Sequence, residues 1–179
     1  MKHYKHDISI DSRPYVESVD VKCPSCKGKA TASQDGLNCL ECHFQIKEKW
    51  FGPVSGIAAC SCSKCKRSLY RRFSHQKNQL NYRFRCPICS TVNNASISWF
   101  KRHIDGKDPY FGLDYYTKIE FQGSRFWIHN KEHKDALKVY IDTEQVGNIS
   151  EKMAKSLPEC VKDHRNRSEL LKLIDKLDD

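Results

Sequence analysis

The fold is decided by the stretch CPSCKGKATASQDGLNCLEC, residues 23–42, and by a second stretch of the same kind, CSKCKRSLYRRFSHQKNQLNYRFRCPIC, residues 62–89. Each stretch begins and ends with a Cys-x-x-Cys pair, so eight of the ten cysteines fall into four such pairs. Twelve residues separate the pairs of the first stretch and 20 separate those of the second. Both separations lie in or near the range of structural zinc sites.

The two stretches predict two tetrahedral zinc sites. A Cys-x-x-Cys pair turns tightly, so two thiolates reach one ion with Zn–S bonds of about 2.3 Å, and two facing pairs complete the tetrahedron. A closed shell of four thiolates leaves no position for an activated water, which makes such sites structural. The predicted ligands are Cys23, Cys26, Cys39 and Cys42 for one zinc ion and Cys62, Cys65, Cys86 and Cys89 for the other.

Two other uses of paired cysteines fit less well. A thioredoxin-like redox site needs one Cys-x-x-Cys motif in a βαβ unit, not four motifs in two hairpins. An iron–sulfur cluster can also use four cysteines, but pairs that face each other across a hairpin favour zinc. Cys60 adds a third thiol beside Cys62 and Cys65, and its irregular spacing predicts a spare buried thiol. The isolated Cys160 is expected on a helix as a small apolar residue.

The residues around the first four cysteines alternate as short strands. Segments 29–33 and 37–39 flank Asp35-Gly36, a strong signal for a two-residue hairpin. A third strand is expected at 44–47, where apolar and polar residues alternate. The pattern is typical of a zinc ribbon.

The second stretch repeats this layout. Strands are expected at 69–73 and 82–85, joined by a polar loop, and at 91–100. A ribbon of about 40 residues is too small to fold on a hydrophobic core alone. A structural zinc ion supplies the missing stability, on the order of 10 kcal/mol or more.

The composition favours a soluble protein. Hydrophobic residues make up 39% and charged residues 30%, and no stretch of about 18 apolar residues predicts a transmembrane helix. The basic residues near the N-terminus are not followed by the apolar segment of a secretory signal. We therefore expect a reducing cytoplasm, where cysteines bind metal rather than form disulfides.

The net charge of +9 is concentrated in the second ribbon. Residues 60–107 contain 11 Lys and Arg against Asp105 alone, for a net charge of +10, whereas residues 1–59 carry +1 and residues 108–179 carry −2. Four thiolates and one Zn²⁺ together carry −2, so the second ribbon stays near +8 after metal binding.

Basic side chains interleaved with aromatic rings predict nucleic-acid binding, DNA or RNA, by the second ribbon. Lysine and arginine neutralise phosphates with release of counterions, and exposed rings stack on unpaired bases, which suits single-stranded or frayed nucleic acid. The alternatives are an acidic protein partner, or rings that form the small core beneath a solvated basic face. The candidate nucleic-acid-binding residues are Lys64, Lys66, Arg67, Tyr70, Arg71, Arg72, Phe73, Tyr82, Arg83, Arg85, Trp99, Lys101 and Arg102.

The C-terminal third predicts a small α+β module. Segments 115–121 and 125–129 are expected to pair as a hairpin, and Asn130 is expected to cap a helix with apolar residues at helical spacing. A short helix is expected at 150–156. A capping box of Asn166 and Glu169 is expected to begin a last helix.

No catalytic motif is present, so we expect no enzyme and no small-molecule substrate. His129 and His133 lie four residues apart, but no glutamate occupies the position required by the metalloprotease motif His-Glu-x-x-His. Gly-rich phosphate loops, nucleophile elbows and paired-carboxylate motifs are also missing from the sequence.

Several short blocks resemble those of a known family. They are WFGP at 50–53, DPYFGL at 108–113, FWIHNKEH at 126–133, and LP at 157–158 followed by RNR at 165–167. The chain is similar in these blocks to the bacterial TFIIB-type zinc-ribbon-containing proteins, also labelled after the primosomal helicase PriA. The resemblance covers most of residues 20–179 and implies fold more than activity, because the biochemical function of that family is not settled.

One departure from the family pattern lies just after Leu157-Pro158, where Glu159-Cys160 replaces an expected aromatic residue and puts any shared contact surface there in doubt. The expected fold is small β-rich metal-bound modules plus α+β: two tandem zinc ribbons with four cysteine ligands each, a β-hairpin and two or three helices. The expected segments are an N-terminal extension at 1–22, ribbons at 23–50 and 51–107, and the α+β module at 108–179.

The expected function is that of a non-catalytic accessory protein that acts within a larger complex and does not bind membranes. The alternative is a protein–protein adaptor or regulatory subunit of a transcription, replication or host-defence assembly.

Overall fold

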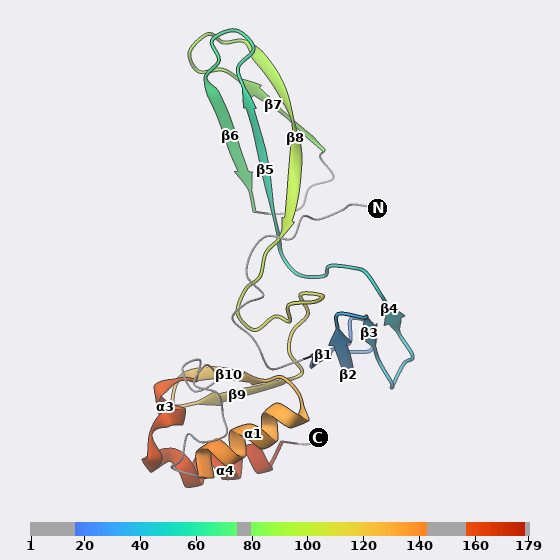
Figure 1. Cartoon of the computed structure of the whole chain (residues 1–179), viewed down its shortest axis with the longest axis vertical. Coiled ribbons are helices and arrows are strands. Elements are labelled where there is room, and N and C mark those ends of the chain that lie inside the picture. The colour runs from blue at the N-terminus through green and yellow to red at the C-terminus, as the bar shows by residue number, and fades with distance from the viewer. Residues whose placement is uncertain (1–16, 75–79, 143–156, 178–179) are drawn as a thin grey trace. The chain divides into compact units, whose positions relative to one another are not determined.

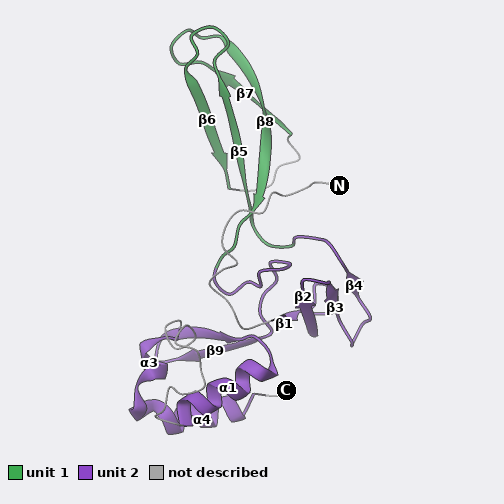
Figure 2. Ribbon diagram, viewed as in Figure 1, with its two compact units in different colours: residues 1–9, 51–104 green, residues 10–50, 105–179 purple. Residues whose placement is uncertain are grey.

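The computed structural model describes residues 17–74, 80–142 and 157–177 (Figure 1). The chain is β-rich with a few helices and divides into two compact units (Figure 2). Unit 1 comprises residues 51–104, and unit 2 comprises the described residues up to Trp50 together with those from Asp105 onward. Each unit contains one group of four cysteines. The first group and the C-terminal segment therefore belong to one unit, although the sequence pattern placed them in separate segments.

Unit 1 is a four-stranded antiparallel sheet built from two hairpins. Its strands are β5 (Val54–Ser61), β6 (Ser68–Phe73), β7 (Asn81–Arg85) and β8 (Val92–Lys101), in the order β6-β5-β8-β7. A Cys-x-x-Cys pair forms the turn between β5 and β6, and another forms the turn between β7 and β8. The two hairpins join through the central pair β5 and β8.

The sequence pattern missed strand β5 and with it the strand order. It indicated β6 and β7 as consecutive strands joined by a loop, but these two strands lie at opposite edges of the sheet. β5 is short of large apolar residues because Gly56, Ala58 and Ala59 occupy its centre, and small residues give a weak strand signal.

One face of this sheet, the aromatic face, carries the core of unit 1. Gly56 pairs with both Phe73 and Trp99, so the two rings share its row. The ring centroids of Phe73 on β6 and Tyr82 on β7 are 5.3 Å apart. Three strand spacings of a flat sheet would separate these edge strands by about 14 Å. The sheet therefore curls, so that its outer strands approach each other over the aromatic face.

Unit 2 contains a second four-stranded antiparallel sheet, in the order β1-β2-β3-β4. The strands are β1 (Ser18–Lys22), β2 (Lys29–Ser33), β3 (Leu37–Asn38) and β4 (Gln45–Ile46). The hairpin expected around Asp35-Gly36 and the third strand after it are confirmed as β2, β3 and β4.

Strand β1 lies in the segment that was expected to be an N-terminal extension. Its Val19 and Val21 are buried, while the residues beside them point outward. β1 also connects to the C-terminal part of unit 2. The N–H of Lys22 donates to the carbonyl of Asp114 at 2.9 Å, and the N–H of Tyr116 donates to the carbonyl of Asp20 at 2.9 Å. These bonds explain why both parts belong to one compact unit.

The C-terminal part begins with the expected hairpin, β9 (Thr117–Phe121) and β10 (Ser124–Ile128). Its two-residue turn has positive φ at both Gln122 (46°) and Gly123 (75°), as a type I′ turn requires. The helices are α1 (Lys131–Asp142), α3 (Glu159–Lys162), a 3-10 turn (His164–Asn166) and α4 (Arg167–Asp175). No helix among the described residues is long and apolar enough to span a membrane.

The helices cover the β9–β10 hairpin. Leu137 of α1 and Leu170 and Ile174 of α4 are fully buried, in one cluster with Ile119 and Phe126 of the hairpin. The short helix expected at 150–156 lies outside the described residues.

The helix caps are as expected in one case and not in the other. Asn130 caps α1, because its Oδ1 accepts the N–H of His133 at 2.8 Å. The prediction that Asn166 and Glu169 form a capping box is wrong. Asn166 Nδ2 donates to the carbonyl of Cys160 at 2.8 Å and its Oδ1 accepts from Gln122 at 2.9 Å, so the side chain ties α3 and the β9–β10 turn together instead of capping α4.

The DPYFGL block forms a loop around a buried carboxylate. Asp108 is 1% exposed, and its two oxygens accept the backbone N–H groups of Tyr110, Phe111 and Leu113 at 2.8, 2.7 and 2.5 Å. Gly112 supplies the positive φ (71°) that closes the loop. The block therefore specifies local packing.

Replacement of Gly56 by alanine is expected to destabilise unit 1. A Cβ at this position would lie 2.7 Å from Cζ3 of Trp99 and 3.0 Å from Cγ2 of Ile97. Such overpacking costs about 1–3 kcal/mol. Hydrogen exchange of peptides from residues 51–104 measures the loss, with Ser96→Ala, on the opposite face, as the matched control. Undiminished protection in Gly56→Ala would contradict the close approach of Trp99.

Candidate metal centres

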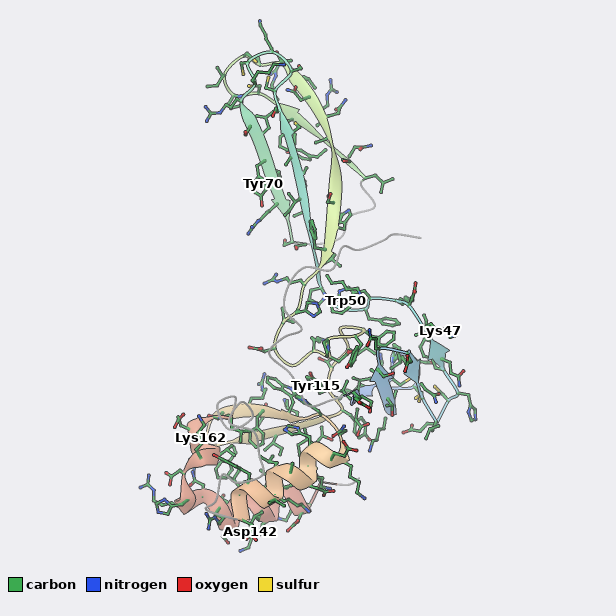
Figure 3. All side chains as sticks on the ribbon, in the orientation of Figure 1. Lys47, Trp50, Tyr70, Tyr115, Asp142 and Lys162 are labelled. Atoms are coloured by element: carbon green, nitrogen blue, oxygen red, sulfur yellow. The ribbon has the colours of Figure 1, made fainter. Side chains whose placement is uncertain are left out.

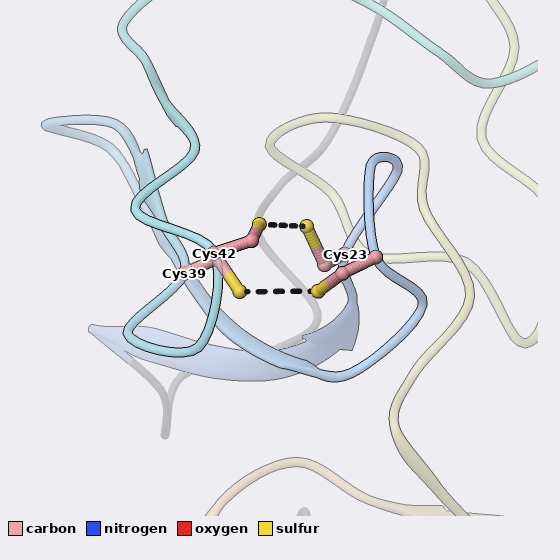
Figure 4. A group of neighbouring side chains, drawn as sticks. Cys23, Cys39 and Cys42 are labelled. Carbon is pink, nitrogen blue, oxygen red and sulfur yellow. Dashed lines mark hydrogen bonds between the residues drawn. The ribbon is translucent and has the colours of Figure 1, made fainter.

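The first cysteine cluster, Cys23, Cys26, Cys39 and Cys42, lies in the β1–β2 and β3–β4 turns of unit 2. The Sγ atoms of Cys23 and Cys42 are 3.7 Å apart, and those of Cys26 and Cys39 are 3.6 Å apart (Figure 4). Four sulfurs bound to zinc at about 2.3 Å form a tetrahedron with edges of about 3.8 Å. A disulfide bond would need about 2.05 Å. The spacing therefore fits four ligands around one metal ion.

The second cysteine cluster, Cys62, Cys65, Cys86 and Cys89, joins the two hairpins of unit 1. Its Sγ separations are 3.4 Å for Cys62 and Cys89, 3.5 Å for Cys65 and Cys86, and 3.6 Å for Cys65 and Cys89. The structure brings together the two sets of cysteines that the spacing predicted, and each set could hold one metal ion.

All four Cys-x-x-Cys turns have the same backbone geometry. In each, the N–H of the first cysteine donates to the carbonyl five residues later; these carbonyls belong to Gly28, Phe44, Arg67 and Thr91, at 2.8, 3.0, 2.8 and 2.9 Å. The residue after the second cysteine has positive φ in each turn, at Lys27, His43, Lys66 and Ser90, with values of 69°, 56°, 60° and 58°. Non-glycine residues avoid this region at a cost of roughly 1–2 kcal/mol. The same unfavourable conformation occurs in all four turns. It directs both thiols of each turn toward one point.

Hydrogen bonds lower the pKa of Cys42 in the first cluster and of Cys62 and Cys89 in the second, and so favour the thiolate form. The backbone N–H of Phe44 lowers the pKa of Cys42 to about 7. The hydroxyl of Thr91, 3.3 Å from Cys89 Sγ, and the backbone N–H of Thr91 lower the pKa of Cys89 to about 6. Thiolate is the form that binds metal, so a lowered pKa reduces the competition of protons with the metal at these positions.

Asn93 connects the two turns of the second cluster. Its Oδ1 accepts the N–H of Ser63 at 2.8 Å, and its Nδ2 donates to the carbonyl of Thr91 at 3.0 Å. The same Nδ2 lies 3.7 Å from Cys62 Sγ, within the range of an N–H···S bond. This residue was not among the predicted ones, because an asparagine on a strand carries no sequence signal for such a role.

A carboxylate, that of Glu41, lies beside the first cluster. Glu41 Oε1 accepts the N–H of Lys29 at 3.0 Å, and its Oε2 lies 3.9 Å from Cys26 Sγ. An amide N–H stabilises a negatively charged sulfur, whereas a carboxylate beside a thiolate adds repulsion. The two clusters therefore differ in the groups around their sulfurs.

The remaining candidate ligands lie elsewhere. Cys60 is half-buried on β5, outside the second cluster, and Cys160 Sγ lies 3.8 Å from the carbonyl of Phe121. His133 Nδ1 accepts the backbone N–H of His129 at 3.1 Å. Burial lowers the pKa of His133 to about 4. This histidine is neutral near pH 7 and supports the start of α1.

The predicted nucleic-acid-binding residues divide between the two faces of the unit 1 sheet. Arg71 pairs with the buried Ala58 and therefore lies on the aromatic face, where its guanidinium sits 5.5 Å from the ring centroid of Tyr82. Phe73, Tyr82 and Trp99 form the ring cluster of that face, and Lys101 shares the row of Val54. Trp99 is 7% exposed, which leaves no room for a base to stack on it.

The opposite face, which we call the exposed face, carries the other side chains. Arg72 pairs with Ile57, which in turn pairs with Ser98, and Arg83 pairs with Asn94. Tyr70, labelled in Figure 3, is 54% exposed on this face. The other members of the predicted set lie at the ends of the sheet: Lys64, Lys66 and Arg67 in or after the first turn, Arg85 at the end of β7 on the exposed face, and Arg102 after β8.

Comparison of the chain with models of protein families, with curated proteins and with solved structures found no match. The chemistry of the two clusters is therefore inferred from their own atoms. Four sulfurs around each ion leave no open position, so the clusters are suited to holding a structure together.

Removal of one cluster ligand is expected to remove one metal ion. The full chain is expected to contain two metal ions, and Cys62→Ser is expected to contain one, because three thiolates and a hydroxyl bind far more weakly than four thiolates. Native mass spectrometry with elemental analysis measures the ratio. Cys60→Ser is the matched control two residues away and should keep both ions. Loss of an ion in the control would place Cys60 among the ligands.

Replacement of Asn93 by alanine is expected to speed metal loss from the second cluster. The variant breaks the link between the two turns and the N–H···S bond to Cys62. Loss of such supporting groups costs about 10–100-fold in metal affinity. Transfer of zinc to a coloured chelator measures the rate for each cluster. Asn94→Ala, the neighbouring residue on the exposed face, should release zinc at the original rate.

Proposed function

We propose that the chain is a non-catalytic accessory protein with two zinc ribbons, and that it binds nucleic acid through unit 1. Zinc fits four thiolates in tetrahedral spacing, because it is a borderline-soft ion without a preferred geometry of its own. In this proposal the zinc ion of unit 1 replaces the large hydrophobic core that a unit of this size lacks, and the zinc ion of unit 2 orders the β1–β4 sheet beside the core of that unit.

The observation that carries the nucleic-acid proposal is the charge of unit 1. Residues 51–104 contain ten Lys and Arg and not one Asp or Glu. With four thiolates and Zn²⁺ the net charge of this segment is about +8. A polyanion that binds such a surface gains from counterion release and meets no repulsive carboxylate.

The exposed face supports contact with phosphates and with one base. Arg72 Nε donates to the hydroxyl of Tyr70 at 2.5 Å, and its guanidinium lies 5.9 Å from the ring centroid. The pair presents a cation and a ring together on β6. Phe73, Tyr82 and Trp99 pack against one another. Of the four rings expected to stack on bases, we therefore assign this role to Tyr70 alone.

A protein partner is the second candidate. Leu40 is 80% exposed and Ile88 is 65% exposed, and each lies between the two cysteines of a Cys-x-x-Cys turn. Exposed apolar residues on rigid turns suit docking against another protein. The chain would then act as an adaptor within a larger assembly. A stoichiometric protein partner recovered from the native host despite nuclease and high salt would favour this function.

Charge reversal on the two faces of unit 1 tests the proposal. Arg72→Glu, on the exposed face, is expected to weaken binding of DNA at low salt by at least about tenfold, because it removes one phosphate contact and adds a repulsive charge. Arg71→Glu, on the aromatic face, changes the net charge equally and should weaken binding much less. Fluorescence anisotropy with labelled oligonucleotides measures both. Equal losses, or none in either variant, would contradict the proposed surface.

A further inference from the structure

The centre of the exposed face is formed by β5 and β8, and most of the side chains that these strands turn outward are small. Strands β5 and β8 pair antiparallel over Val54–Ala58 and Ile97–Lys101, and nearer the cysteine turns β5 pairs with β6 and β8 pairs with β7. The residues they turn outward include Ala59 and Ser61 on β5 and Asn94, Ser96 and Ser98 on β8, all of which are exposed. Three larger apolar side chains, Ile57 on β5 and Val92 and Phe100 on β8, share this face with them, so a ligand can approach the backbone closely only between these three.

Arginines stand on both sides of the β5–β8 ribbon. Arg72 on β6 flanks it at one edge, and Arg83 and Arg85 on β7 flank it at the other. Three strand spacings, about 14 Å measured along the curved surface of the sheet, separate the two margins. The exposed face therefore presents two positive margins and a neutral centre in which polar and apolar side chains are mixed.

The curl of the sheet makes this face convex. The contact of Phe73 with Tyr82, with centroids 5.3 Å apart, draws the outer strands toward the aromatic face. The central strands β5 and β8 then project farthest on the exposed side. A convex ribbon with basic margins fits a groove better than it fits a single strand.

The major groove of B-form DNA has matching dimensions. It is about 12 Å wide and about 8.5 Å deep, it admits a two-stranded β-ribbon, and phosphates line both of its edges. Double-stranded RNA has a deep, narrow major groove that protein elements do not enter. Surfaces for single strands present several stacking rings, whereas among the Phe, Tyr and Trp residues that the structure describes in unit 1 only Tyr70 is more than half exposed.

We propose that unit 1 binds duplex DNA by placing the β5–β8 ribbon in the major groove. This inference rests on the proposed nucleic-acid function and adds the form of the nucleic acid. Arg72 contacts the phosphates of one strand, and Arg83 and Arg85 contact those of the other. Asn94, Ser96 and Ser98 face the edges of the bases, where amide and hydroxyl groups can both donate and accept hydrogen bonds.

Three probes test the form of the nucleic acid. They are a DNA duplex of two helical turns, one of its strands alone, and an RNA duplex of the same sequence, each titrated at one salt concentration with the zinc-loaded full chain. We expect the DNA duplex to bind roughly tenfold more tightly than either other probe, because only it offers the wide groove. Arg72→Ala should reduce the slope of log K against log[salt] for the duplex by about 0.9.

One substitution separates groove binding from simple attraction of charges. Ser98→Trp places a bulky ring at the centre of the exposed face, keeps the charge, and suits a strand. It should hold the ribbon away from the groove and weaken duplex binding at least about tenfold, yet preserve or strengthen single-strand binding through stacking. Val139→Trp adds the same ring at a half-exposed position of α1 in unit 2, also keeps the charge, and is the matched control, which should bind both probes as the original chain does. Unchanged metal content and hydrogen-exchange protection show that the fold is intact.

The possible results distinguish failure of groove binding from failure of the proposed nucleic-acid function. Tighter binding of the single strand, equal binding of the RNA duplex, or duplex binding that Ser98→Trp leaves unchanged would overturn groove binding while the proposed nucleic-acid function stands. Binding of none of the three probes at low salt would overturn both, and would leave the protein-adaptor function as the remaining candidate.

Discussion

The convergence of four sulfurs at the turn end of unit 1 is the constraint on which the rest of that unit depends. The sheet has a single layer, and its core is a small group of rings on one face. Two hairpins that met only through β5 and β8 would have little to fix their register at the turn end. The second cysteine cluster joins the two turns, and Asn93 adds a link that needs no metal. The register set there decides which side chains reach each face.

In unit 2 the same cysteine pattern occurs beside a larger hydrophobic core. There the first cluster borders a sheet whose strand β1 bonds to residues just before β9, and the helices cover the β9–β10 hairpin with an apolar core. The buried carboxylate of Asp108 orders the loop that leads into this region. Unit 2 thus has a hydrophobic core in addition to its cluster, and unit 1 relies far more on its cluster.

The sequence predicted the features that depend on local spacing. The cysteine pairs, the Asp35-Gly36 hairpin and the cap of α1 by Asn130 each need only a few neighbouring residues. It did not predict features that depend on partners far along the chain. Strand β5 carries small residues because Trp99 lies over Gly56, and Asn166 turns away from α4 because Gln122 and Cys160 offer better partners. The separation of Arg71 from Arg72 likewise follows from strand register.

In a single-layer sheet, successive residues of a strand alternate between the packed face and the solvent-exposed face. Along β8, Asn93, Ala95 and Ile97 face the rings and the cluster, while the side chains between them face solvent. Substitutions in this strand would therefore fall into two alternating classes. Those at residues that face the rings affect folding of the unit, and those at residues that face solvent affect binding. Partner preference in related chains could drift along one class while the scaffold stays constant in the other. Because unit 1 is a single-layer sheet, its fold and its binding surface can evolve independently of each other.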